Sequence, residues 1–120
     1  MDLFSSEIVK NILPCDGVTN YHGIILDTNA CNFYFETLMN TIHWKNDEAI
    51  IFGKKIITKR KVAWFGTSEF SYKYSGIIKT AVLFTKELLA LKKIVEKESG
   101  ETYNSCLLNL YHTGEEGMGY

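Results

Sequence analysis

The sequence has little proline, few cysteines and no long apolar segment. Its single proline is Pro14, and no linker-like stretch interrupts the 120 residues, so residues 1–120 are predicted to form one domain. The three cysteines, Cys15, Cys31 and Cys106, lack C-x-x-C spacing, which argues against a disulfide framework or a cysteine zinc site and predicts reduced, mostly buried thiols. Apolar runs such as GIIL and LLAL are far shorter than the ~20 residues that span a bilayer. With no secretory signal visible at the N-terminus, the prediction is a cytoplasmic protein without membrane segments.

The chain also lacks an excess of charge of either sign. A net charge of −1 gives no overall electrostatic attraction to nucleic acid, but the segment KKIITKRK, residues 54–61, carries five of the thirteen basic residues. Lysine and arginine neutralise phosphates, an apolar tip such as Phe52 can wedge between bases, and tyrosines can stack on a base. The ordinary alternative is that the charges form a solvated face and the aromatics belong to the core.

Two segments have the spacing of amphipathic helices. The first is predicted to begin after Asp27 or Thr28, either of which can cap it, and to end near His43 and Trp44. The second is predicted to end at Gly100. Their apolar stripes are Cys31, Tyr34, Phe35, Leu38, Met39 and Ile42 in the first helix, and Phe84, Leu88, Leu91 and Val95 in the second.

Three further segments have strand-like patterns. AIIFGKKIITKRKVAWFG predicts a hairpin that turns near residues 53–55, and FSYKYSG predicts a short strand with Tyr72 and Tyr74 on one face. YNSCLLNLYH predicts a strand on which Asn109 and Tyr111 point away from the leucine face. Together these elements predict an α+β domain with segregated helices and an antiparallel sheet.

No catalytic or metal motif is complete in this sequence. None of the histidines, His22, His43 and His112, is followed two residues later by an acid, as the usual non-haem iron motif requires. A pairing of His112 with Glu115 is conceivable, but a loop histidine is the simpler interpretation. A nucleophile elbow, a Walker loop and a dinucleotide fingerprint are also missing.

Four segments, in this order and spacing, resemble the N-terminal part of the AlkB-type dioxygenases, which use Fe(II) and 2-oxoglutarate to repair alkylated nucleic acid. They are IFGKKIITKRKVAWFG, YKYSG, ETYNSCLLNLY and HTGEEGMGY, and the resemblance runs from about NILPCDGVTNY to Tyr120. It implies the first part of a double-stranded β-helix, or jelly roll, with two helices packed on an antiparallel sheet and a hairpin that forms a substrate lid. The implied activity is oxidative demethylation of an alkylated base in DNA or RNA, with release of succinate, carbon dioxide and formaldehyde.

The resemblance also implies roles for individual residues. Asn109 and Tyr111 would bind 2-oxoglutarate, since an amide and a phenol can donate hydrogen bonds to carboxylate oxygens. Arg60 would pack or contact substrate. The implied substrate-binding residues are Phe52, Gly53 and Lys54 on a hairpin that probes the duplex, and Tyr72, Lys73 and Tyr74 on the lid over the damaged base.

In the family, the iron motif His-x-Asp directly follows the segment that resembles GMGY. We therefore expect the metal ligands just after Tyr120, no catalytic or metal residue within this chain, and no turnover of 2-oxoglutarate by this chain alone. We also expect self-association through unpaired sheet edges. Two alternatives remain open: a non-catalytic nucleic-acid-binding module, and a fragment without activity.

Overall fold

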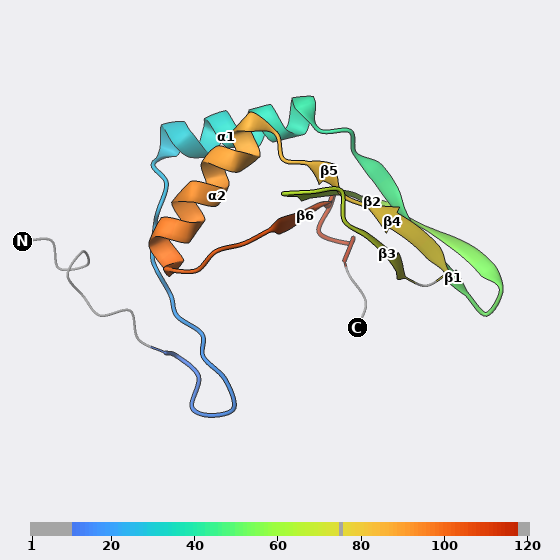
Figure 1. The fold of residues 1–120 in the computed structure, drawn as a ribbon, viewed down its shortest axis with the longest axis horizontal. Coiled ribbons are helices and arrows are strands. Elements are labelled where there is room, and N and C mark those ends of the chain that lie inside the picture. The colour runs from blue at the N-terminus through green and yellow to red at the C-terminus, as the bar shows by residue number, and fades with distance from the viewer. Residues whose placement is uncertain (1–10, 75, 118–120) are drawn as a thin grey trace, which may run out of the picture. The chain divides into compact units, whose positions relative to one another are not determined.

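The computed structural model describes residues 11–74 and 76–117, and the chain divides into two compact units, residues 1–33 and 34–120. Along the chain the elements are α1 (Thr28–Thr41), β1 (Lys45–Ile51), β2 (Lys54–Gly66), β3 (Ser71–Tyr74), β4 (Ile77–Thr80), β5 (Val82–Leu83), α2 (Lys86–Ser99) and β6 (Ser105–Leu110) (Figure 1). The architecture is therefore α+β. None of the helices in these described ranges is long and apolar enough to cross a membrane.

The first unit contains a short loop organised by one side chain. Asn11 pairs with Asn20 in an isolated antiparallel bridge, and its Oδ1 atom accepts hydrogen bonds from the backbone N–H groups of Leu13 (3.1 Å) and Thr19 (2.7 Å). The unit ends in the first turn of α1, where Asp27 Oδ1 accepts from the Ala30 N–H at 2.7 Å. Asp27 is thus the N-cap of α1, one of the two predicted alternatives.

Only the end of α1 contributes to the core. Ile42, which follows the helix, is 7% exposed, and Leu38 packs against the same cluster. Phe35 and Met39, predicted on the apolar stripe of this helix, are 67% and 40% exposed. The predicted helix is confirmed, but the structure buries only part of its apolar stripe.

β1 and β2 form the predicted hairpin, with a two-residue turn at Phe52 and Gly53. Both turn residues have positive φ, 51° and 75°, as a type I′ turn requires. β1 begins at Lys45, four residues earlier than the segment from which the hairpin was predicted.

β2 is the central strand. It pairs with β1 and β6 in antiparallel fashion and with β5 in parallel, making a four-stranded mixed sheet. β3 and β4 form a separate two-stranded antiparallel sheet, here called the β3–β4 ribbon. β4 and β5 were not predicted from the sequence.

α2 ends where the sequence predicted, at Gly100, and the structure adds its start. Thr85 is the N-cap, with its side chain accepting from the Leu88 N–H, and Gly100 closes the helix with φ 74°. The helix buries Leu88 against Ile42 and Phe65, the other two residues at the centre of the core. Partly buried residues pack around these three: Leu38, Trp44, Ala63, Phe84, Leu91 and Leu108.

The cysteines are free, but they are less buried than predicted. Cys15 and Cys31 are exposed, and Cys106 on β6 is half-buried. Burial raises the pKa of the Cys106 thiol above its ordinary value of 9.0, so this thiol stays protonated at neutral pH and is a poor nucleophile.

Candidate functional site

The two faces of β2 have different roles. Ala63 and Phe65 point to the helices and the core, so Arg60, Val62 and Trp64 point to the other face because side chains alternate along a strand. Asn109 on β6 is directly opposite Val62 in the pairing register, which places it on the same face as Arg60. The face opposite the helices therefore carries the polar end of β6.

An irregularity in the hairpin brings Asp47 opposite Arg60. Between the pairs Asn46–Lys61 and Glu48–Ile57, one residue of β1 faces three residues of β2, so β2 bulges by two residues. Thr58 compensates for the interrupted ladder: its hydroxyl accepts from the Asp47 N–H at 3.1 Å and donates to the Arg60 carbonyl at 2.9 Å.

Asp47 is the centre of a charged cluster. Its Oδ2 atom accepts from Arg60 Nη2 at 2.8 Å, and its Oδ1 atom is ion-paired with Lys79 Nζ from the β3–β4 ribbon. Burial by itself would raise the pKa of Asp47, but the hydrogen bonds and charges of Lys79 and Arg60 outweigh it and lower that pKa below 3.8. Asp47 is thus a carboxylate at neutral pH, and it joins β1, β2 and β4.

Arg60 also contacts the first predicted cosubstrate residue. Its Nη1 atom donates to Asn109 Oδ1 at 3.1 Å, and Arg60 itself is 9% exposed. The guanidinium is therefore occupied by two protein acceptors. Of the two roles predicted for Arg60, this geometry favours packing over direct contact with substrate.

The β3–β4 ribbon contacts the four-stranded sheet through one of its faces. Tyr72 and Lys79 are cross-strand partners in the ribbon, so they share a face. The Tyr72 ring meets the Trp64 ring edge-on, with centroids 4.9 Å apart and an interplanar angle of 80°, while Lys79 pairs with Asp47. At the turn of the ribbon, a Cβ on Gly76 would lie 3.2 Å from Ile50 of β1.

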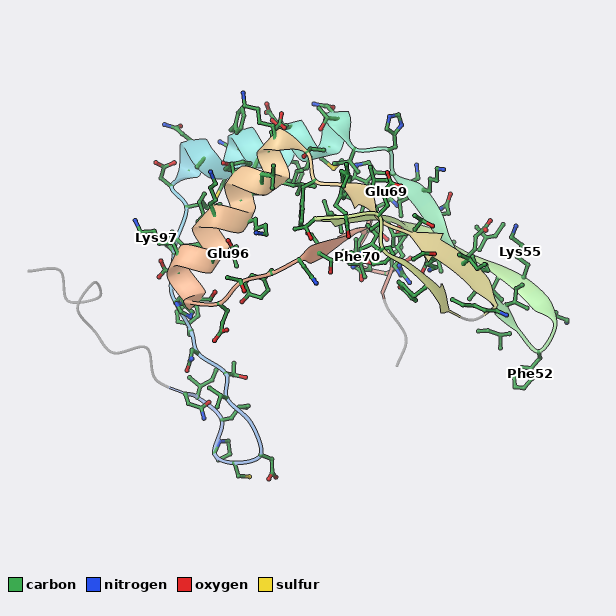
Figure 2. All side chains as sticks on the ribbon, viewed as in Figure 1. Phe52, Lys55, Glu69, Phe70, Glu96 and Lys97 are labelled. Carbon is green, nitrogen blue, oxygen red and sulfur yellow. The ribbon has the colours of Figure 1, made fainter. Side chains whose placement is uncertain are left out.

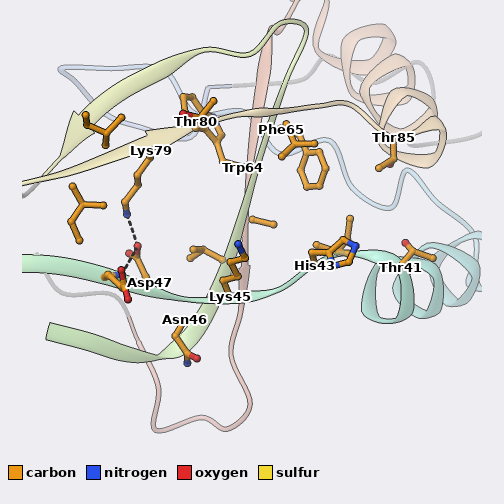
Figure 3. A pocket seen from close by; sticks show the side chains of 17 residues that line it. Thr41, His43, Lys45, Asn46, Asp47, Trp64, Phe65, Lys79, Thr80 and Thr85 are labelled. Carbon is orange, nitrogen blue, oxygen red and sulfur yellow. Dashed lines mark hydrogen bonds and ion pairs between the residues drawn. The ribbon is translucent and has the colours of Figure 1, made fainter. Parts of the chain in front are cut away.

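A cavity of about 490 Å³ lies beside this cluster, within the usual range of small-molecule sites (Figure 3). Its walls include Asp47 and Lys79, whose ion pair is drawn in the figure, together with Lys45, Trp64 and Thr80.

The hairpin tip is a second predicted site. Phe52 is 101% exposed and projects from the end of the hairpin, with Lys55 close by on β2 (Figure 2). Lys54 is exposed, whereas Lys55 forms an ion pair with Glu48, with 3.1 Å between Lys55 Nζ and Glu48 Oε1. The basic segment of the sequence is therefore not one positive surface, because Arg60 is buried and Lys55 has an acidic partner.

The structure thus brings some predicted residues together and separates others. Arg60 and Asn109 are hydrogen-bonded, and Tyr72 lies on the ribbon that contacts the same sheet. Tyr111 directly follows the last residue of β6 and is 41% exposed. Gly53 at the hairpin turn is seven residues from Arg60, or roughly 23 Å along the strand. Of the ribbon residues, Lys73 is exposed, and only the backbone of Tyr74 is described.

Three residues of this site were not identified from the sequence: Asp47, Trp64 and Lys79. Trp64 lies in a segment that resembles the dioxygenase family, but no role was predicted for it. Asp47 precedes the segment used to predict the hairpin, and Lys79 lies in a segment to which no element was assigned. No sequence signal identified Asp47 or Lys79 as members of one cluster.

The loop after β6 contains a hydrogen bond between a histidine and an acid. His112 Nδ1 lies 3.0 Å from Glu116 Oε1, so its partner is Glu116 and not Glu115. The hydrogen bond from His112 lowers the pKa of Glu116 below 4.5. Among residues 11–74 and 76–117 no group of three or more His, Cys, Asp or Glu side chains could hold a metal ion, so these residues do not fit iron. The expected iron position after Tyr120 lies outside the described residues.

Comparison with known proteins supports part of the resemblance. No family model matches the chain. The chain is 30% identical to alpha-ketoglutarate-dependent dioxygenase alkB homolog 3 of Bos taurus over 94 residues, which are 78% of this chain. It is 29% identical to the Homo sapiens protein of the same name over 99 residues, or 82% of this chain. It is also 36% identical over 66 residues, 55% of the chain, to the uncharacterized protein R406 of Acanthamoeba polyphaga mimivirus. The matched regions cover only 32%, 34% and 35% of these three relatives.

Proposed function

We propose that this chain is the nucleotide-recognition part of an AlkB-like dioxygenase that demethylates alkylated bases in DNA or RNA. Alpha-ketoglutarate, the cosubstrate in the name of the matched relatives, is the same compound as 2-oxoglutarate. In this proposal the four-stranded sheet is the first part of a jelly roll, and residues 1–120 belong to one catalytic domain. The similarity to two dioxygenases over about four fifths of the chain supports the proposal.

The observation that carries the proposal is the composition of the face of β2 and β6 that points away from the helices. It presents Asn109, with Arg60 and Asp47 behind it, and the β3–β4 ribbon contacts the same face through Trp64. A cosubstrate site and a nucleotide lid would need to adjoin in this way, because the reacting methyl group must reach the oxidant.

Asn109 and Tyr111 would bind the cosubstrate. Arginine has only donors, so the amide oxygen of Asn109 faces Arg60 and the amide N–H groups are left to donate to a carboxylate. Tyr111 adds a phenolic donor two residues further on. The described residues would bind and orient the cosubstrate and the nucleotide. Iron and 2-oxoglutarate would supply the oxidation, with no iron ligand among residues 11–74 and 76–117.

The nucleic acid would contact the hairpin tip and the ribbon. Phe52 is fully exposed, and Gly53 gives the backbone beside it the turn that presents the ring. Lys54 and Lys73 are exposed cations that can neutralise phosphates, and Tyr72 would lie over the base. The same role expected for Tyr74 concerns a side chain outside the described part of the structure. Self-association and a cytoplasmic location stay predictions, as does the absence of turnover by this chain alone.

The experiment is a binding titration with two fluorescent single-stranded oligonucleotides that differ by one N-methyl group on one base. We expect the chain to bind both, to prefer the methylated strand, and to show saturable 2-oxoglutarate binding by calorimetry. Binding with a steep salt dependence but without preference for the methyl group or response to 2-oxoglutarate would instead indicate a non-catalytic module. Absence of binding to either strand would contradict both and indicate a fragment without activity.

A further inference from the structure

We infer that Asp47 and Arg60 form a positioning pair that fixes the amide orientation of Asn109, so that this residue presents only hydrogen-bond donors to its ligand. The pair thereby makes the site selective for a hydrogen-bond acceptor such as a carboxylate. The inference rests on the proposed function for the identity of that ligand, 2-oxoglutarate, and not for the orientation itself.

The orientation follows from the chemistry of arginine. A guanidinium carries donors and no acceptor, so the Asn109 atom 3.1 Å from Arg60 Nη1 is the amide oxygen. Turning the amide by 180° would place its NH₂ group against the guanidinium, where two donors face each other without a shared acceptor. Within the described part of the chain, no hydrogen bond donated by the Asn109 NH₂ group occurs, so these donors remain for a ligand.

Arg60 in turn is fixed by Asp47. Nη2 donates to Asp47 at 2.8 Å, and the two side chains are only 10% and 14% exposed, so water does not compete strongly for either group. One guanidinium thus makes two hydrogen bonds, to Asp47 and to Asn109. A lysine has one charged atom and no planar fork, and it cannot reproduce both bonds with the same geometry.

A second cation holds Asp47 in place. The Oδ1 atom of Asp47 is ion-paired with Lys79 of β4, while its Oδ2 atom accepts from Arg60 Nη2 at 2.8 Å. Because each carboxylate oxygen has a cationic partner, Asp47 cannot turn away from Arg60 without losing one of these contacts.

The first part of the test needs no ligand. In the ¹⁵N-labelled chain, the two side-chain N–H signals of Asn109 are assigned by their loss in Asn109→Asp and are then followed in Asp47→Asn and Arg60→Lys. Glu48→Gln is the matched control, because it removes a carboxylate of the same strand whose partner, Lys55, is exposed. We expect both positioning variants to shift the Asn109 signals and the control to leave them unchanged.

The second part adds 2-oxoglutarate. We expect wild type and Glu48→Gln to show the same shift of the Asn109 signals, and Asp47→Asn to bind roughly tenfold more weakly, as when a hydrogen bond to a charged group is weakened. Asn109→Asp should stay folded, because the new carboxylate can pair with Arg60. It should lose 2-oxoglutarate binding, because this carboxylate would face a carboxylate of the ligand and neither group can donate a hydrogen bond.

The outcomes separate the two proposals. Asn109 signals that do not change in Asp47→Asn or Arg60→Lys would overturn the positioning pair. If the signals respond to these variants but not to 2-oxoglutarate, the orientation is correct and the cosubstrate assignment in the proposed function is wrong. Should a positioning variant unfold, seen as loss of dispersion of the Trp64 indole signal, Asn109→Asp decides: wild-type 2-oxoglutarate binding by that variant would overturn the inference.

Discussion

Replacing Phe52 by asparagine is expected to stabilise the fold while weakening nucleic-acid binding. Phe52 has φ 51°, in the left-handed region that costs a residue with a Cβ about 1–2 kcal/mol. Asparagine tolerates this region well, and Asn-Gly is the preferred sequence of a type I′ turn. Since the ring is 101% exposed, no buried apolar area is lost. We expect the free energy of unfolding to rise by about 1 kcal/mol.

The effect on binding should have the opposite sign. Stacking of one base on an aromatic side chain contributes about 1–3 kcal/mol, so loss of the Phe52 ring should weaken single-strand binding by about tenfold. Phe52→Trp keeps a stacking surface and should keep the affinity. Phe35→Leu is the control for a general loss of exposed aromatic area, because Phe35 on α1 is 67% exposed and belongs to no proposed site.

Urea unfolding followed by circular dichroism measures the first quantity, and fluorescence anisotropy with a labelled oligonucleotide measures the second. If Phe52→Asn unfolds at a lower urea concentration than wild type, the predicted stabilisation is wrong and the ring packs in solution. An unchanged affinity would show that the exposed ring has no role in binding.

Three further variants test the core, a close backbone approach and the charged cluster. Leu88→Ala should lower the free energy of unfolding by about 2–4 kcal/mol, since Leu88 is 4% exposed at the centre of the core; a loss under about 1 kcal/mol in urea unfolding would contradict this. Gly66→Ala places a Cβ 2.8 Å from the Ser68 carbonyl oxygen and should cost about 1–3 kcal/mol in the same assay, whereas wild-type stability would show that the backbone relaxes freely. The pKa of Asp47 is lowered in the folded state. The stabilisation of the fold by Asp47 is therefore complete above pH 3.8, the ordinary pKa, and is lost as the pH falls through the lower folded-state pKa. Stability measured across the acid range should therefore fall less steeply in Asp47→Asn than in wild type, and identical slopes would exclude this contribution.

Local signals were enough to predict much of the fold. α2 was identified because its apolar residues have helical spacing and Gly100 supplies the left-handed residue at its end. The hairpin was identified because Gly53 separates two β-rich segments, and its turn residues have the expected positive φ. In both cases the information lies within a few residues, where sequence patterns are most reliable.

β4 and β5 could not be predicted in this way. Ile77–Thr80 and Val82–Leu83 are separated only by Ala81, so the sequence shows one short apolar stretch and no turn. Ala81 is 1% exposed and its N–H donates to the Phe70 carbonyl at 2.7 Å, which ends the β3–β4 ribbon. β5 then pairs with the last two residues of β2, a contact between segments far apart in the sequence.

The site depends on the same kind of information. In the sequence Arg60 belongs to a basic run, and its partner Asp47 is thirteen residues away in a different strand. A regular hairpin ladder from the Phe52–Gly53 turn would pair Asp47 with Thr58, whereas the bulge brings Arg60 opposite it. Because of the bulge, Arg60 is not an exposed cation like its neighbours in the basic run. It is buried, ion-paired with Asp47 and hydrogen-bonded to Asn109. For this reason the residue types indicated the chemistry, while the strand register determined which cation serves the proposed cosubstrate site.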